Sequence, residues 1–70
     1  MRIQINGEAR DVPDKLSLLE LTTFLNLAPE RVAVELNRNV VRRADWSVTI
    51  LREDDRVEIV HFVGGGERGI

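Results

Sequence analysis

The chain has 70 residues, a net charge of −2 and no cysteine. This length accommodates one domain. The lack of cysteine excludes disulfides, thiolate nucleophiles and cysteine-ligated metal centres, and it agrees with a reducing cytoplasm. Phosphate binding requires a clustered basic surface, whereas each arginine here has acidic neighbours, so we expect no nucleic-acid partner.

Membrane association is also not expected. No apolar run approaches the about 20 residues of a membrane span. Met1–Ile5 alternates between apolar and polar residues instead of forming the apolar core of a signal peptide. The sequence therefore predicts a cytoplasmic protein with no membrane partner.

The first elements predicted along the chain are two strands joined by a tight turn. Ile3 and Ile5 alternate with polar residues, which is the period of a half-buried strand. Asn6-Gly7 is the strongest short hairpin signal, because both turn positions need a positive φ. A second strand is therefore expected over Glu8–Val12.

A helix is predicted next. Ser17-Leu18-Leu19-Glu20 is a capping box, in which the side chain of each end residue accepts a hydrogen bond from the backbone N–H of the other. The helix should run to about Asn26, before Pro29 stops the segment. Its apolar stripe is expected to contain Leu18, Leu21, Phe24 and Leu25.

The second half of the chain predicts further strands. In Val32–Asn37, alternation directs Val32, Val34 and Leu36 to the core and Ala33 and Glu35 outward. The pieces expected after it are a turn at Asn37–Asn39, a short strand at Val40–Val41, an irregular or single-turn helical piece at Arg43–Trp46, an extended piece at Thr49–Leu51, a turn at Glu53–Asp55 and a last strand at Val57–Phe62.

This order predicts an α+β fold of the β-grasp, or ubiquitin-like, type. We expect a mixed sheet of four to five strands, with one main helix packed on one face and the first and last strands as central neighbours. The domain should span residues 1–63. Residues 64–70 should form a flexible tail that contains Gly64-Gly65-Gly66 and the extension Glu67–Ile70.

Three stretches resemble the thiamine-biosynthesis sulfur carriers of the ThiS family: Val32–Asn37, Arg43-x-x-Trp46 and Asp55–Gly66. The last is the most specific, since it is an unbroken run that ends in the glycines. Two departures stand out. The family usually has Gly-Asp before the last strand, where this chain has Asp54-Asp55, and the family usually ends at Gly-Gly.

The resemblance implies a carrier for thiamine (thiazole) biosynthesis rather than an enzyme. A ubiquitin-activating-like enzyme would adenylate the carboxylate of Gly66, using its own ATP and magnesium, so no cofactor is assigned to this chain. A sulfur donor such as a cysteine desulfurase would then displace AMP. The resulting thiocarboxylate would supply sulfur to a thiazole synthase. Gly64 and Gly65 would be the flexible lead, because glycine has no Cβ to prevent close approach.

The extension conflicts with this chemistry. While Glu67 is attached, the carbonyl of Gly66 belongs to an amide, and no carboxylate exists there. We expect a processing protease to remove Glu67–Ile70; the alternatives are a cloning artefact or a paralogue that never carries sulfur. Taken alone, the glycine run would equally fit a floppy terminus or a linker.

A docking surface is predicted on the last strand. If Val57 and Ile59 face the helix, then Glu58, Val60 and Phe62 share the opposite face and form an apolar patch for partner enzymes. The alternative is a bulge or a shifted register that buries Phe62.

Other residues receive structural interpretations. His61, the single histidine, is more typical of a packed or hydrogen-bonded residue than of a ligand, so no metal is assigned. Trp46 is expected in the core or as a lid, and Arg42-Arg43 on a solvated face.

Rival functions remain open from sequence. Related carriers serve molybdopterin, cysteine or tRNA thiolation, and a ubiquitin-like binding module would keep the fold while its tail never reacts. An intrinsic enzyme is the weakest interpretation, because no nucleophile–base pair is visible.

Overall fold

The computed structural model of the chain describes residues 1–62. Its elements in chain order are β1 (Arg2–Ile5), β2 (Glu8–Asp11), α1 (Leu18–Phe24), the 3₁₀ helix η1 (Pro29–Arg31), β3 (Val32–Leu36), β4 (Asn39–Val40), the 3₁₀ helix η2 (Arg43–Val48) and β5 (Arg56–His61). The strands form one sheet in the order β2-β1-β5-β3-β4.

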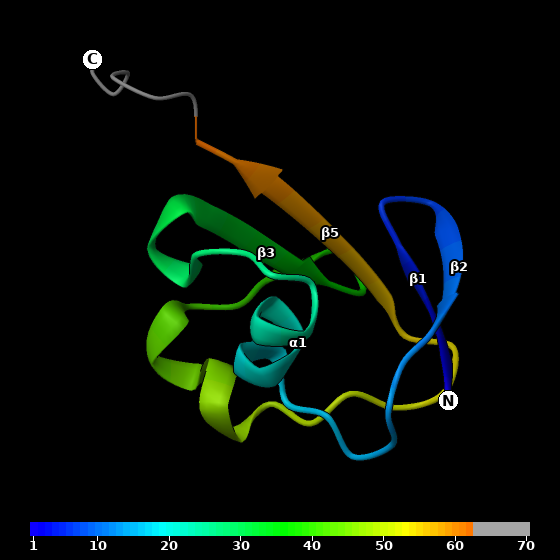
Figure 1. Cartoon of the computed structure of the whole chain (residues 1–70). Helices are drawn as coiled ribbons and strands as arrows, with labels where there is room; N and C mark the ends of the chain where they lie inside the picture. Colours follow the sequence, from blue (N-terminus) through cyan, green and yellow to red (C-terminus); the bar gives the residue numbers. More distant parts are fainter. Residues whose placement is uncertain (63–70) are drawn as a thin grey trace.

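The layers confirm the predicted fold class. β1 and β5 pair in parallel, and the other neighbours are antiparallel. Figure 1 shows α1 lying across one face of the sheet, with β5 running between β1 and β3. The first and last strands are therefore central neighbours, as expected for a β-grasp domain.

The first hairpin has the predicted turn. Asn6 and Gly7 both have a positive φ, of 51° and 84°, and Ile5 pairs with Glu8 across the turn. β2 ends at Asp11, one residue before the predicted end. Val12 stays aligned with the hairpin, because its N–H donates to the Met1 carbonyl at 2.9 Å.

The capping box is present at the start of α1. The Ser17 hydroxyl accepts from the Glu20 N–H at 3.0 Å, and the Glu20 carboxylate accepts from the Ser17 N–H at 2.9 Å. This exchange satisfies two backbone donors that a helix N-terminus would otherwise leave free.

The helix ends two residues before its predicted end. α1 stops at Phe24, and Asn26 has a φ of 63°, beyond the helical region. The Asn26 N–H donates to the Thr23 carbonyl at 3.0 Å and the Leu27 N–H to the Thr22 carbonyl at 2.8 Å, which together form a Schellman motif. The asparagine therefore ends the helix, while Pro29 begins η1.

Phe24 does not belong to the buried stripe, contrary to expectation. It is 47% exposed, whereas Thr22 is 1% exposed. Thr22 lies four residues after Leu18 and on its face, while Phe24 lies six residues after it and points away. The Thr22 hydroxyl donates to the Leu19 carbonyl at 2.6 Å, so its burial leaves no polar group unsatisfied.

The core lies between α1 and the sheet and is closed by the connection after β4. The buried apolar side chains are Ile3, Ile5, Val12, Leu18, Leu21, Val32, Val34, Trp46, Leu51, Val57 and Ile59. Trp46 is 2% exposed, and its indole Nε1 donates to the Val41 carbonyl at 2.8 Å. The predicted core role of Trp46 is confirmed.

The second half of the chain departs from prediction in details. β4 covers Asn39–Val40 instead of Val40–Val41, and η2 runs two residues beyond Trp46 to Val48. The expected extended piece is present, since Ile50 forms an isolated antiparallel bridge with Ser17. Leu36 is partly buried rather than fully inside. Within residues 1–62, no helix is both long enough and apolar enough to span a bilayer.

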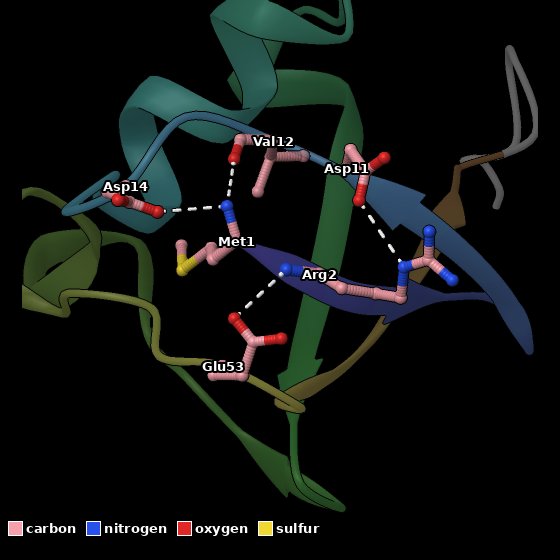
Figure 2. Close-up of polar contacts among 6 residues, drawn as sticks. All are labelled: Met1, Arg2, Asp11, Val12, Asp14 and Glu53. Carbon is pink, nitrogen blue, oxygen red and sulfur yellow. Dashed lines mark hydrogen bonds and ion pairs between the residues drawn. The ribbon is translucent and has the colours of Figure 1, made fainter.

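The amino terminus is tied to the turn after β2. The Met1 ammonium donates to the Val12 carbonyl at 2.8 Å and to Oδ1 of Asp14 at 2.9 Å. Figure 2 shows the ammonium between these two oxygens. The same close-up shows Arg2 bonded to Asp11 through its side chain and to Glu53 through its backbone N–H.

These contacts change the protonation of the Met1 amine. The hydrogen bond to Asp14 is the largest cause that raises the pKa of the ammonium above its ordinary value of 8.0. Burial opposes the rise, and the negative charges of Asp14, Glu53 and Asp11 add to it. Folding therefore favours the charged amine.

A pH dependence of stability follows for a chain with this free amine. Because the folded pKa is the higher one, the stabilisation is fully present below pH about 8 and is lost as the pH rises through the folded pKa. The chain has no cysteine or tyrosine, so the amine dominates titration just above that pH. The unfolding free energy measured by urea titration should fall between about pH 7 and about pH 10, a range that brackets the ordinary pKa of an α-amine.

The Asp14→Asn variant is the control for this effect. It keeps the size of the side chain and one acceptor oxygen, but it removes the negative charge, so the hydrogen bond to the ammonium is weaker and the charge no longer adds to the raised pKa. Its unfolding free energy should depend less on pH in the same window. An identical slope in both proteins would show that the Met1–Asp14 contact does not stabilise the fold.

Candidate functional site

The outer face of β5 is exposed, as the alternation predicted. Val57 and Ile59 are 1% and 9% exposed and face α1, whereas Val60 and Phe62 are 59% and 55% exposed. Glu58 is exposed on the same side as Val60. Phe62 keeps the alignment of the strand, because its N–H donates to the Arg31 carbonyl at 2.9 Å. The alternative in which Phe62 is buried is therefore wrong.

Two residues of β3 extend this surface. Ala33 pairs with Val60 and Glu35 pairs with Glu58, and directly opposed residues project to the same face of a sheet. We call Ala33, Glu35, Glu58, Val60 and Phe62 the outer patch. Its end near Phe62 is apolar, and its other end carries Glu35 and Glu58, with the exposed Arg56 two residues before Glu58 on the same face.

The acidic end of the outer patch is electrostatically unfavourable in the isolated domain. Like charges directly opposite each other across two strands are destabilising. Neither Glu35 nor Glu58 forms an ion pair with another of residues 1–62.

Asn6 holds β5 where β1 ends. The Asn6 backbone N–H donates to the Val57 carbonyl at 2.9 Å. Its carboxamide then makes two further bonds to one residue: Oδ1 accepts from the Ile59 N–H at 2.7 Å, and Nδ2 donates to the Ile59 carbonyl at 3.2 Å. The side chain therefore continues the pairing of β1, the strand that it follows. We call such a set of side-chain hydrogen bonds to the backbone of β5 a clamp.

Asn37 makes a similar clamp at the other end of β5. Its backbone N–H donates to the Arg56 carbonyl at 2.8 Å, and its Oδ1 accepts from the Arg56 N–H at 2.9 Å. Its Nδ2 donates to Oδ1 of Asp55 at 3.1 Å. Sequence reasoning missed both clamps, since it assigned Asn6 and Asn37 to turns alone.

Of the remaining site candidates, some lie within the described residues and some do not. Gly64, Gly65 and Gly66 lie outside the described residues. His61, expected to be packed or hydrogen-bonded, has an exposed side chain on β5, where its backbone pairs with Val32. Among residues 1–62, no three histidine, cysteine, aspartate or glutamate side chains gather as a metal site would require.

Comparison with known proteins places the chain in a family. The family description "ThiS family" matches residues 3–66 of the chain. The chain belongs to the ThiS family. A crystal structure of the thiamine biosynthesis protein (ThiS) from Geobacter metallireducens is similar, with a TM-score of 0.82 and 36% identity, over 94% of this chain and 100% of that one.

Named sequence relatives include a carrier and an enzyme. The sulfur carrier protein ThiS of Bacillus subtilis (strain 168) is 32% identical over 65 residues, which are 91% of this chain and 98% of that protein. The thiazole synthase of Magnetococcus marinus is 45% identical over 67 residues, or 96% of this chain. The chain spans 21% of the length of that synthase.

The structure explains how this chain accommodates Asp54-Asp55 where ThiS proteins usually have Gly-Asp. Where Gly-Asp is usual before the last strand, Asp54 takes a φ of 70°. Aspartate adopts this region more readily than most residues with a Cβ. The Asp55 carboxylate also accepts from the Arg52 N–H at 2.8 Å, which stabilises the turn into β5.

Proposed function

We propose that this chain is a sulfur carrier of thiamine (thiazole) biosynthesis that reacts through Gly66 after residues 67–70 are removed. The observation that carries the proposal is the ThiS match over residues 3–66, which ends at Gly66. The similarity to the Bacillus subtilis sulfur carrier over 98% of that protein supports the same role.

The chemistry needs a free terminal carboxylate and an external activating enzyme. A carboxylate oxygen of Gly66 attacks the α-phosphorus of ATP and releases pyrophosphate, which gives an acyl adenylate. A sulfur nucleophile then attacks the acyl carbon, AMP departs with the bonding electrons, and a thiocarboxylate remains. ATP and magnesium belong to the adenylating partner, and a sulfur donor such as a cysteine desulfurase supplies the sulfur. When the sulfur arrives as a persulfide, the first product is an acyl disulfide, and a thiol reductant cleaves it to the thiocarboxylate while a new disulfide forms on the donor.

The glycines before the reacting group suit this reaction. Gly64 and Gly65 lack a Cβ, so a backbone of these residues can enter a narrow channel and lie close to a bound nucleotide. The chain itself needs no base or nucleophile, because each bond is made in the active site of a partner.

A thiazole synthase is the partner we propose for sulfur delivery. The support is the Magnetococcus marinus protein of that name, part of which is similar to 96% of this chain. Delivery to molybdopterin, cysteine or tRNA thiolation is the rival. Co-purification with a thiazole synthase rather than a molybdopterin synthase large subunit would decide between them.

The outer patch is the surface we propose for docking. Val60 and Phe62 are more than half exposed and lie within four residues of Gly64, so an enzyme bound there would be near the reacting end. Exposed apolar area flanked by charge is typical of interaction sites. Glu35 and Glu58 favour a partner with lysine or arginine opposite the acidic end.

The Phe62→Asp variant should weaken binding to the adenylating enzyme by about tenfold or more, because a buried phenylalanine contributes about 1.5–3 kcal/mol. Calorimetric titration of the variant against the enzyme measures the loss. Val48→Asp is the matched control, since Val48 is 73% exposed on η2, away from the outer patch. Unchanged affinity, or unfolding of the Phe62→Asp variant in circular dichroism, would contradict the docking role.

The function itself is tested by mass spectrometry. The chain ending at Gly66 is incubated with an adenylating enzyme of this pathway, ATP and sulfide. The expected product is heavier by the difference between sulfur and oxygen. A chain that binds the enzyme and never forms the adenylate or the thiocarboxylate is a binding module and not a carrier.

A further inference from the structure

We propose that Asn6 is a positioning residue for the reacting end of the chain, because its carboxamide fixes the last part of β5. This inference rests on the proposed carrier function. A carrier that docks through the outer patch presents its glycine segment from the end of β5, so the placement of that strand end sets the point from which the segment starts. Residues 60–62 connect the domain to that end, so their placement matters for reaction.

The end of β5 has a strand on one side only. β1 stops at Ile5, which pairs with Val57, while β5 continues to His61. Beyond Val57 the backbone pairing comes from β3 alone, up to Val32 opposite His61. The next backbone N–H and carbonyl of β5 that point towards the side of β1 belong to Ile59. The Asn6 side chain forms hydrogen bonds with both of them.

The Asn6 carboxamide acts as one more peptide unit of β1. It offers one acceptor and one donor, at 2.7 Å and 3.2 Å from the two backbone groups of Ile59. These bonds join residues 53 positions apart and are partly buried, so they connect the first turn of the fold to the end of the last strand. The sheet is thereby extended by two residues of β5 without a longer β1.

Asparagine meets two requirements at this position. The turn needs the positive φ of 51°, which glycine, asparagine and aspartate accept best. The clamp needs a donor and an acceptor on one short side chain, which asparagine alone among these supplies. Glycine would keep the turn and lose the clamp, and ionised aspartate would keep only the acceptor.

Loss of the clamp should loosen the residues that follow Ile59. Val60 and Phe62 would then be held by β3 and the Arg31 carbonyl alone. Strand ends with fewer backbone bonds open more readily than strand centres. Small misplacement of a reacting group, of about 1 Å, can slow a reaction by about 100-fold, so a looser strand end should lower kcat.

Asn37 provides a matched control within the same chain. It has the same φ of 51° and clamps the same strand through its side chain, but at Arg56, the end far from the glycines. Asn37→Gly should therefore remove two side-chain hydrogen bonds, as Asn6→Gly does, although from a more exposed position. It should not alter the placement of residues 60–62.

The first measurement is amide hydrogen exchange of Asn6→Gly and Asn37→Gly in the chain ending at Gly66. We expect Ile59 to exchange about tenfold faster in Asn6→Gly, as loss of one backbone-type hydrogen bond predicts, and Arg56 to respond in Asn37→Gly. An unchanged exchange rate of Ile59 in Asn6→Gly would overturn the clamp.

The second measurement separates positioning from folding. With the adenylating enzyme, Asn6→Gly should lower kcat about tenfold with little change in KM, because the outer patch still docks, while Asn37→Gly should retain the wild-type kcat. Equal kcat values for the two variants would overturn the positioning role alone. A wild-type chain that is never adenylated would overturn the proposed function, and the positioning role with it.

Discussion

The 70-residue chain should give no thiocarboxylate under conditions in which the chain ending at Gly66 is fully converted. With Glu67 attached, the Gly66 carbonyl is part of a peptide bond, and the oxygen that must attack ATP does not exist as a carboxylate. The effect is a complete loss and not a reduced rate. Intact mass and pyrophosphate release measure it on both chains in parallel.

Two controls define this result. Gly66→Ala in the shortened chain keeps the carboxylate and adds a Cβ, so it should react slowly instead of not at all. Addition of a protease that cleaves after Gly66 should restore conversion of the 70-residue chain. A cell that makes thiamine while it holds only the full-length protein would refute the processing step.

The Trp46→Ala variant should lose about 3–5 kcal/mol of unfolding free energy, which is typical of truncating a buried large aromatic side chain. Trp46 is 2% exposed, and its removal also leaves the Val41 carbonyl without the indole donor. The Arg43 guanidinium, 5.6 Å from the ring centroid, would lose its cation–π partner. A domain of this length has a total stability of about 4–10 kcal/mol, so the variant should be largely unfolded at modest denaturant concentrations.

Far-UV circular dichroism in a urea titration is the suitable measurement, because the variant lacks the single tryptophan that fluorescence would report. Val48→Ala is the matched control on the same 3₁₀ helix, where the side chain is 73% exposed. It should change stability by no more than about 0.5 kcal/mol. Comparable losses for both variants would show that the connection after β4 does not close the core through Trp46.

The parts of the fold that sequence predicted correctly depend on short-range geometry. Asn6-Gly7 specifies a turn within two residues, and Ser17 with Glu20 specifies a helix start within four. The errors arose where two signals competed. Asn26 ended the helix before Pro29 could, and hydrophobicity was given more weight than helical spacing at Phe24.

The outer patch was predictable only in part for a related reason. Alternation along one strand placed Glu58, Val60 and Phe62 outward, as observed. To place Ala33 and Glu35 beside Val60 and Glu58, one must know the register between β3 and β5, and the alternation within a single strand does not give it. The bonds of Asn6 to Ile59 were missed because the turn already accounted for an asparagine there.

The central place of β5 also has a mechanical consequence. A pull on the chain beyond Phe62 acts along an inner strand, which is flanked by β1 in parallel and β3 in antiparallel orientation. Such tension loads the hydrogen bonds on both flanks in shear, so they share the force and do not peel apart one by one. The domain can therefore carry tension applied beyond Phe62 without loss of its strands one after another.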